Sequence, residues 1–596
     1  MSIYLSKTEI TSYCGNVVPL KLIADHDISC DSIKWQSDSD HIKIRDFSKS
    51  KDYAFNNGVL LTLSKEGCTK VICEHDGKKY ECKVSISKRR HATRDDKMNV
   101  YPADLHIHTS KEHKRDIFAA REVDFPSDCI ASAKDSGAIE CSVLTDHACT
   151  LNDRDFFRGF TDEEETPHSG LVVFPGAESE ITVIEKDRFG LSHKNSGESV
   201  TIHASNYSNA HSWDEHFANM ADSEFVVAGL AHPCVVGWDK NGIWNYSLYK
   251  NSQNPEFKRI MRLTETGRGD YSQSSMLYHY VYSQALDCGL KISPCSTSDS
   301  HGSYEPVIGK TFIVSPEKSK EMFYDALVSN RIYACDSGAV ELKMSVNGCI
   351  MGEIMPITDT YKFHIEASVI KNVENAMPVK CTVVSDYGKK LLTVPFDGSA
   401  DFEIKSDSAR YFYVLLTDSE ARKTWSSPVW TGREFDDFSH IEKLKPIDKN
   451  GWTAFDEITS SDASAVINDN PKDVWGGKAE TASIIIDMKE EKQIAAVGHY
   501  APPVFRFELM EADIPIESVV TEFACEYKIS TSCDGKEYEE AKSGYIRAFG
   551  GEDVLAFEPK AARYVRFEVL STVGADSERK EFEGKKVKIG ELSIFE

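Results

Sequence analysis

The stretch that decides the fold is Asp104-Leu105-His106-Ile107-His108-Thr109-Ser110. Successive side chains of a strand point to opposite faces, so His106 and His108 project the same way with apolar residues between them. Two imidazoles on one face, about 6–7 Å apart along a strand, can bind a single divalent ion. A His-x-His pair alone is a weak signal, and it gains weight here because similar strand ends recur downstream.

Between about residues 99 and 340, short apolar runs alternate with helical patterns, which is typical of α/β units around a parallel sheet or barrel. Each apolar run is followed by a histidine or a carboxylate: Asp146 and His147, Glu178, His203, His232, Glu265, and Asp299 with His301. Any one of them could be an ordinary polar residue at a strand end. Because the C-terminal ends of parallel strands share one rim, the recurrence predicts that these side chains converge on a metal site.

Bulk properties limit the class of protein. A chain of 596 residues is too long for one core, and roughly three to five domains are expected. No run of eighteen or more apolar residues and no secretory signal are visible, and the 16 cysteines are scattered without CxxC pairs, so we expect a cytoplasmic protein with reduced thiols. The net charge of −26 disfavours nucleic acid, and neither nucleic acid nor membrane is an expected partner. A small anionic substrate stays possible, because a metal cluster inverts the local field.

The flanking segments alternate apolar and polar residues, as half-buried strands do. Residues 1–95 contain the hairpin signal Asp76-Gly77 and resemble the immunoglobulin-like β-sandwich modules of bacterial multidomain proteins. Residues 341–440 predict a second β-sandwich. Two polar segments of the central region, Asp162–Glu165 and Glu185–Ser199, are expected to be solvated loops or lids over the rim.

The C-terminal segment, residues 450–596, predicts a third all-β unit. Its strand patterns resemble the jelly-roll family of discoidin and coagulation-factor type C domains, which often bind carbohydrate; they are Ser483–Asp487, Tyr527–Lys536, Ala562–Phe567 and Ile589–Ile594. The likeness rests on positions that maintain the fold, so a carbohydrate-binding module and a purely structural module are both open. No candidate ligand lies here, and the segment is therefore expected to be separable from the chemistry.

The motifs of the central region, in order, are His-x-His, Thr-Asp-His, Gly-x-Glu, His, Ala-His-Pro and Ser-Asp-x-His. This order resembles the PHP (polymerase and histidinol phosphatase) superfamily. Arg331-Ile332-Tyr333-Ala334 followed by a β-sandwich is similar to its branch of large bacterial metal-dependent hydrolases. The resemblance covers about residues 99–435. It implies a distorted (β/α)7 barrel, residues 99–340, that binds two or three divalent metals and hydrolyses phosphoesters, while some relatives attack other esters or carbamates.

The resemblance also implies a ligand set. The matching positions are His106, His108, His147, Glu178, His203, His232, Asp299 and His301. One departure concerns the residues after His-x-His-Thr, where many relatives continue with Ser-Asp-Gly and this chain has Glu112-His113-Lys114. His113 occupies the slot of that aspartate, so we expect it to be a ligand as well. Whether a third metal binds is the point that this departure leaves open.

The ligand chemistry is consistent with the hydrolase that the resemblance implies. Neutral imidazoles suit Zn, Mn or Fe, while Glu178 and Asp299 balance charge and can bridge two ions. The expected function is a phosphoesterase that uses a metal-bridging hydroxide on a small phosphorylated substrate. Asp146 is expected to orient a ligand or to shuttle a proton, and Arg268 is a candidate for holding a substrate anion. The alternatives are a carboxylic or carbamic ester hydrolase with the same metal centre, and a non-catalytic glycan-binding or scaffold protein.

Overall fold

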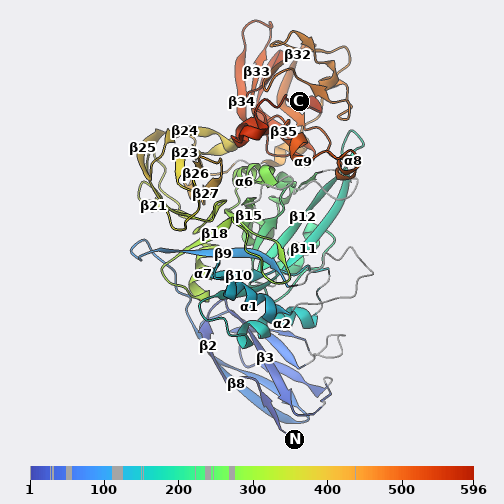
Figure 1. Ribbon diagram of the computed structural model, residues 1–596. Coiled ribbons are helices and arrows are strands. Elements are labelled where there is room, and N and C mark those ends of the chain that lie inside the picture. The colour runs from blue at the N-terminus through green and yellow to red at the C-terminus, as the bar shows by residue number, and fades with distance from the viewer. Residues whose placement is uncertain are drawn as a thin grey trace.

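The structure is a computed structural model that describes residues 2–26, 28–29, 32–47, 57–109, 125–149, 151, 153–221, 223, 225–234, 243–245, 247–267, 275–435 and 438–596. The protein is multidomain and consists mostly of β-strands. Figure 1 shows an N-terminal sandwich at one end, a C-terminal β unit at the other, and the central α/β region with a second sandwich between them. Among the described helices, none is both long enough and apolar enough to cross a bilayer.

The N-terminal unit is a β-sandwich of two four-stranded sheets, in the orders β1-β3-β6-β5 and β2-β8-β7-β4. Its strands are β1 (Ile3–Leu5), β2 (Glu9–Tyr13), β3 (Val17–Ala24), β4 (Lys34–Ser37), β5 (Ile42–Asp46), β6 (Gly58–Leu63), β7 (Gly67–His75) and β8 (Lys78–Ser87). Asp76 and Gly77 both have positive φ, 48° and 74°, which is the two-residue turn that joins twisted strands without splaying them. Leucine, isoleucine and valine side chains from both sheets fill the space between them.

The central region is built on one large, curled mixed sheet. Its strands are β9 (Asn99–His108), β10 (Cys141–Leu144), β11 (Val172–Lys186), β12 (Ser192–Ile202), β13 (Val227–Ala231), β14 (Trp244–Asn245), β15 (Met261–Gly267), β16 (Ser293–Ser296), β17 (Ser300–His301), β18 (Lys310–Ser315) and β19 (Ile332–Cys335). Its helices are α1 (Pro126–Ser136), α2 (Asp153–Glu165), α3 (Trp213–Ala221), α4 (Leu248–Asn251), α5 (Pro255–Ile260), the 3-10 turn η2 (Ser275–Leu277), α6 (Tyr278–Asp287) and α7 (Lys320–Val328).

Among the described residues, the sheet does not form a clear (β/α)7 barrel, which is the fold, in distorted form, that the resemblance implies. Strands β9, β10 and β11 are parallel, and so are β13, β15 and β16, but β12 runs antiparallel to β11 and to β13. The physical reason is a tight turn at Gly190, where φ is 75° and the chain reverses directly into β12 without a crossover helix. Strand β18 also pairs antiparallel with β9, which leads the sheet out of the parallel set.

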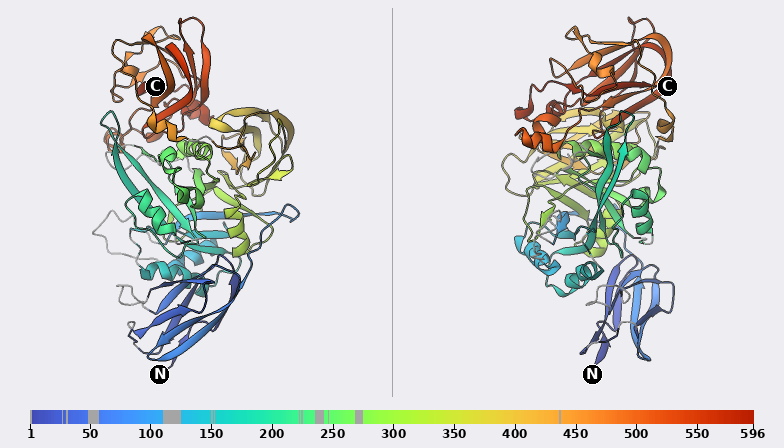
Figure 2. Two further views of the ribbon diagram at one scale, coloured as in Figure 1. Left: turned by 180° about the vertical axis from the view of Figure 1, so that it is seen from behind. Right: turned by 90° about the vertical axis from the view of Figure 1, so that its right-hand side faces the viewer.

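Two polar segments expected to be loops are regular structure. Asp162–Glu165 forms the last turn of α2, whose phenylalanines Phe156, Phe157 and Phe160 are buried. Two acidic residues of this turn form ion pairs, Glu163 with Lys320 and Glu164 with Lys7. Residues 185–199 belong to the long hairpin of β11 and β12, which stands away from the central sheet (Figure 2). Both segments are polar in composition, and composition alone does not distinguish a polar helix turn or a hairpin from a loop.

The second sandwich shares a sheet with the central region, because β27 pairs with β19. Its second sheet has the order β21-β20-β22-β25. The elements are β20 (Val340–Val346), β21 (Cys349–Ile350), β22 (Thr360–Val369), β23 (Pro378–Val384), the 3-10 turn η3 (Asp386–Gly388), β24 (Lys390–Pro395), β25 (Ser399–Lys405), β26 (Tyr411–Asp418), β27 (Lys423–Ser426) and β28 (Val429–Trp430). The chain thus passes into the second sheet of the sandwich after the predicted division at residue 340, while the sheet of the central region continues into the sandwich through β27.

The C-terminal unit is an antiparallel β structure around the long strands β32 and β35. Its elements are η4 (Phe438–Lys443), β29 (Thr453–Asp456), β30 (Ser461–Asp462), η5 (Ser464–Ile467), β31 (Trp475–Gly476), β32 (Ala482–Tyr500), α8 (Arg506–Glu511), α9 (Ile516–Val520), β33 (Glu526–Ser532), β34 (Glu539–Tyr545), β35 (Glu552–Val569), α10 (Val573–Ser577), η6 (Lys580–Phe582), β36 (Lys588–Ile589) and β37 (Glu591–Phe595). One contiguous cluster of buried apolar side chains runs from the central region through the second sandwich into this unit. The C-terminal unit is thus packed as part of the body.

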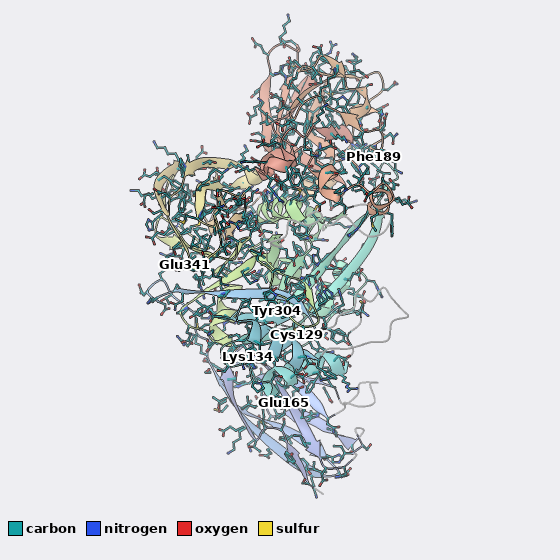
Figure 3. All side chains as sticks on the ribbon, viewed as in Figure 1. Cys129, Lys134, Glu165, Phe189, Tyr304 and Glu341 are labelled. Atoms are coloured by element: carbon teal, nitrogen blue, oxygen red, sulfur yellow. The ribbon has the colours of Figure 1, made fainter. Side chains whose placement is uncertain are left out.

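The tip of the β11–β12 hairpin is bound by the C-terminal unit. The guanidinium of Arg188 donates to both carboxylate oxygens of Glu552 at 2.9 Å, and Tyr500 donates its hydroxyl to Asp187 at 2.8 Å. Phe189 meets the Tyr500 ring edge to face, with 5.6 Å between centroids, and Figure 3 shows Phe189 at this junction. The hairpin therefore connects the central sheet physically to the C-terminal unit.

Arg188→Ala is expected to loosen this hairpin. A bidentate, partly exposed ion pair contributes up to about 1 kcal/mol, which corresponds to roughly fivefold faster local opening. Hydrogen exchange of the backbone amides of β11 and β12 measures this, and Lys186→Ala is the matched control, because Lys186 is exposed on the same hairpin. Equal exchange rates in Arg188→Ala and wild type would show that the Arg188–Glu552 ion pair does not hold the hairpin.

Candidate metal centre

The structure brings together seven of the residues that the sequence singles out, and they come from the strand ends around one rim. The seven are His106, His108, His147, Glu178, His232, Asp299 and His301. His106 and His108 lie at the end of β9, and Glu178 lies on β11; all three side chains are fully buried. Such a set of histidines and carboxylates in an interior is costly unless protons or cations compensate it.

Glu178 lies between two sets of histidines. Its Oε1 is 3.1 Å from Nε2 of His106 and 3.8 Å from Nε2 of His232. Its Oε2 is 3.2 Å from Nε2 of His108 and 3.0 Å from Nδ1 of His147. Among the described residues, neither carboxylate oxygen accepts a well-formed hydrogen bond. Each oxygen thus faces a different histidine set, as the two arms of a bridging carboxylate would.

Asp299 and His301 complete the rim from the loop after β16. The backbone N–H of Asp299 donates to the carbonyl of His106 at 3.0 Å, and strand β17 places His301 beside His108 in register. Oδ1 of Asp299 then lies 3.1 Å from Nε2 of His108. Nδ1 of His301 is 2.9 Å from the Asp299 carbonyl, and donation there leaves the Nε2 lone pair available for coordination.

Glu265, at the end of β15, orients two of the histidines. Its Oε1 lies 2.9 Å from Nδ1 of His106, and its Oε2 accepts the backbone N–H of His232 at 2.9 Å. Thr297 donates its hydroxyl to Oε1 at 2.7 Å. Because Nδ1 of His106 donates to the Glu265 carboxylate, Nε2, which faces Glu178, is the ring atom placed to bind a metal ion. Fixing the ring in this way is the usual part of a carboxylate behind a metal-ligating histidine.

Two residues of the rim have a strained backbone. His232 has φ of 47° and Asp299 has φ of 52°, a left-handed conformation that side chains other than glycine adopt at a cost of about 1–3 kcal/mol. His232 directly follows β13, and Asp299 lies in the loop between β16 and β17, directly before β17. Strain of this kind persists where the surrounding structure holds it, and it is typical of functional sites.

The electrostatics show how strongly these groups depend on one another. Burial lowers the pKa of His106, but the carboxylates of Glu178 and Asp299 outweigh burial and hold that pKa well above its ordinary value. Burial likewise opposes the shift of His108, and its contacts with Asp299 and Glu178 raise the pKa to about 9. Burial raises the pKa of Glu178, yet the neighbouring imidazoles hold it well below its ordinary value. The buried carboxylates therefore stabilise positive charge on or beside the histidine rings.

The donor set fits divalent metal ions. Four overlapping groups of ligand atoms lie within 4.8 Å of one another: His108 with His147 and His301; His106 with His108 and Glu178; Glu178 with Glu198 and His232; and His106 with His232 and Glu265. Two ligands on one ion, with bonds of about 2.0–2.2 Å, lie roughly 3.0–3.5 Å apart. Most of the separations given above fall in that interval, so the imidazoles and carboxylates are spaced as ligands that share ions.

His203 does not join the cluster. Its Nε2 lies 2.7 Å from the carbonyl oxygen of Gly15 in the N-terminal sandwich, and its ring packs against Phe174 and Tyr324. Burial lowers its pKa to about 3, so the ring is neutral. The reason is the direction of β12: because that strand is antiparallel, the residue after it points away from the rim at which the parallel strands end.

Three further predicted residues have other outcomes. His113 and Arg268 lie outside the described residues. Asp146 lies beside the cluster, where its two carboxylate oxygens accept the backbone N–H and the hydroxyl of Thr109 at 2.7 and 2.6 Å. These contacts fix the chain directly after His108, so the contacts of Asp146 are those of a positioning residue and not of a proton shuttle.

Glu198 is the residue of the cluster that the sequence reasoning missed. It lies on β12 opposite Glu180 of β11 and Ala231 of β13, and its Oε2 is 3.5 Å from Nε2 of His232. Burial, and then the charge of Glu178, raise its pKa well above the ordinary value. Glu198, Val200 and Ile202 occupy alternate positions, as residues on one face of a strand do. The interpretation of the polar segment as a loop left Glu198 without a defined face.

No protein-family model and no curated protein matches the chain. Solved structures of family 32 carbohydrate-binding modules are similar to about a quarter of it. One from Clostridium perfringens, in complex with GalNAc-β-1,3-galactose, is 15% identical over 26% of this chain and 100% of its own, with a TM-score of 0.20. Another, from C. perfringens NanJ in complex with galactose, is 15% identical over 26% of this chain and 99% of its own, with a TM-score of 0.20. The module of AlyQ, in complex with 4,5-unsaturated mannuronic acid, is 16% identical over 25% and 98%, with a TM-score of 0.18.

Proposed function

We propose that this chain is a metal-dependent hydrolase, and that its preferred substrates are small phosphoesters. The observation that carries the proposal is the position of Glu178, buried between two histidine sets with one carboxylate oxygen toward each. When bound, a pair of divalent ions lowers the pKa of a water molecule and neutralises charge that develops on substrate oxygens. A buried, strained and charge-rich cluster without such ions would be a large unexplained cost.

The protein groups have distinct parts in this proposal. His108, His147 and His301 would hold one ion, and His232 with Glu178 would hold the other. Asp299, 3.1 Å from His108 and 3.5 Å from His232, faces both sets. The orienting groups lie behind them: Glu265 for His106 and His232, and Asp146 for the chain after His108. Ligands fixed in this way cost little reorganisation during the reaction.

A substrate panel tests the function. Phosphomonoesters, phosphodiesters, carboxylic esters and carbamates are assayed with the full chain after addition of Mn²⁺ or Zn²⁺. Phosphoester hydrolysis that is lost on chelation and restored by metal is the expected result. If only carboxylic esters or carbamates are hydrolysed, the chain is a hydrolase of those esters and not a phosphoesterase. No hydrolysis together with glycan binding by the same protein would leave the chain as a binding protein.

The purified protein is expected to carry two or more divalent ions per chain, since the ligand groups exceed what one ion can use. Elemental analysis of unchelated protein measures the content. Removing the ions should also lower the unfolding temperature, because free ion at about a thousand times its Kd stabilises the folded state by about 4 kcal/mol. Fewer than about one ion per chain, or no change in unfolding after chelation, would contradict the metal centre.

A further inference from the structure

We propose that Glu198 is a metal ligand, and that it makes one half of the centre a carboxylate-rich site for a hard divalent cation such as Mn²⁺. This inference rests on the proposed function and deepens it. The ligand atoms of Glu178, Glu198 and His232 form one of the compact groups at the rim, within 4.8 Å of one another. The group therefore offers two carboxylates and a single imidazole.

The hairpin is what delivers Glu198. Antiparallel pairing sets Glu198 beside Ala231, the residue directly before His232, and directs its carboxylate to within 3.5 Å of that ring. The same reversal of the chain removes His203 from the rim. A carboxylate on β12 thus stands in the half of the centre where the sequence pattern expected another imidazole.

An independent observation indicates that this group is built for a ligand. Glu178, which it shares with the other half, is fully buried, and among the described residues neither of its oxygens accepts a well-formed hydrogen bond. Adding the carboxylate of Glu198 to such a place increases the repulsion between acidic groups unless a cation lies between them. A divalent ion satisfies both carboxylates and the His232 ring at once.

The two halves then differ in ligand chemistry. His108, His147 and His301 supply three imidazoles, which suit Zn or Fe. The Glu198 half supplies mainly oxygen, which suits Mn²⁺ and Mg²⁺ better than an all-imidazole site does. The inference is therefore a mixed centre, in which Glu198 determines which ion the oxygen-rich half accepts.

Metal titration of the chelated, full-length protein tests this without any activity measurement. Calorimetric titration with MnCl₂ should show two ions in the wild type. In Glu198→Gln one ion should remain and the other should bind about 100-fold more weakly or not at all, as for loss of a ligand. Glu180→Gln is the matched control: it makes the same change opposite Glu198 on the hairpin, but Glu180 belongs to none of the ligand groups.

A second variant, Glu198→His, restores a ligand of the other kind. It should recover the second ion and raise the affinity for Zn²⁺ relative to Mn²⁺ by at least about tenfold. Unchanged binding of both ions in Glu198→Gln would overturn the inference while leaving the proposed function intact, and so would equal losses in Glu198→Gln and Glu180→Gln. A wild type that binds no ion would overturn both together.

Discussion

Replacing Glu178 with glutamine is expected to lower the rate of phosphoester hydrolysis by about two to four decades, or about 3–5 kcal/mol of barrier. Glutamine keeps the size and most of the packing of the side chain, but it removes the charge that faces His106 on one side and His108 on the other. Because both halves of the centre share this carboxylate, its loss weakens both together. The fall should appear mainly in kcat.

The matched control is Glu180→Gln, which makes the same change on the same face of β11, two residues further along. Its kcat should remain within a few-fold of the wild type. Steady-state kinetics are measured together with metal content and circular dichroism, so that loss of the ions, loss of fold and loss of chemistry are separated. Near-normal turnover of Glu178→Gln with full metal occupancy would show that the carboxylate does not bridge the two halves.

The convergence of the candidate ligands could be predicted because it depends on a local rule. A run of apolar residues followed by a histidine or carboxylate places that side chain at the C-terminal end of a strand, and parallel strands end at one rim. The rule holds for His106, His147 and His232, whose strands β9, β10 and β13 belong to parallel pairs. It fails for His203, whose strand is antiparallel.

The direction of β12 could not be predicted from the apolar residues that mark its end. A short apolar run such as 200–202 is the same in a parallel strand as in an antiparallel one, and the turn that decides between them lies ten residues earlier at Gly190. Exposed hairpins are polar on most of their surface, so composition favours a loop. Glu198 was missed for the same reason, because a residue assigned to a loop has no defined face.

The contact between the C-terminal unit and the rest of the chain could also not be predicted from the sequence, because it involves pairs of buried charges that are far apart in the chain. Asp576 of α10 accepts the Tyr280 hydroxyl at 2.7 Å and forms an ion pair with Lys390 of the second sandwich. Such partners carry no local pattern. The expectation that residues 450–596 are separable from the chemistry followed from the absence of candidate ligands there. The structure shows that these residues pack closely against the rest of the chain, and their separability from the chemistry stays a prediction.

The charge at the centre of that contact is Asp287, the last residue of α6, and it connects three units. Its carboxylate is fully buried, pairs with Arg547 of the C-terminal unit, and accepts the Tyr411 hydroxyl of the second sandwich at 2.9 Å. The backbone N–H of Tyr387 donates to the same carboxylate at 3.1 Å. A negative charge at the C-terminal end of a helix opposes the helix dipole, so these partners are what make Asp287 acceptable there.

Asp287→Asn is expected to destabilise the junction by about 3–5 kcal/mol, because it removes the charge that pairs with the buried guanidinium of Arg547, which is only 2% exposed. Calorimetry should show the first unfolding transition lowered by roughly 10 °C. The double variant Asp287→Asn with Arg547→Met removes both charges and should recover most of the loss, since an apolar pair of similar volume is often as stable as a buried ion pair. If the single variant unfolds like the wild type, or the double variant is the less stable of the two, the pair does not hold the C-terminal unit in place. The hydrophobic cluster that crosses the junction would then carry the docking alone.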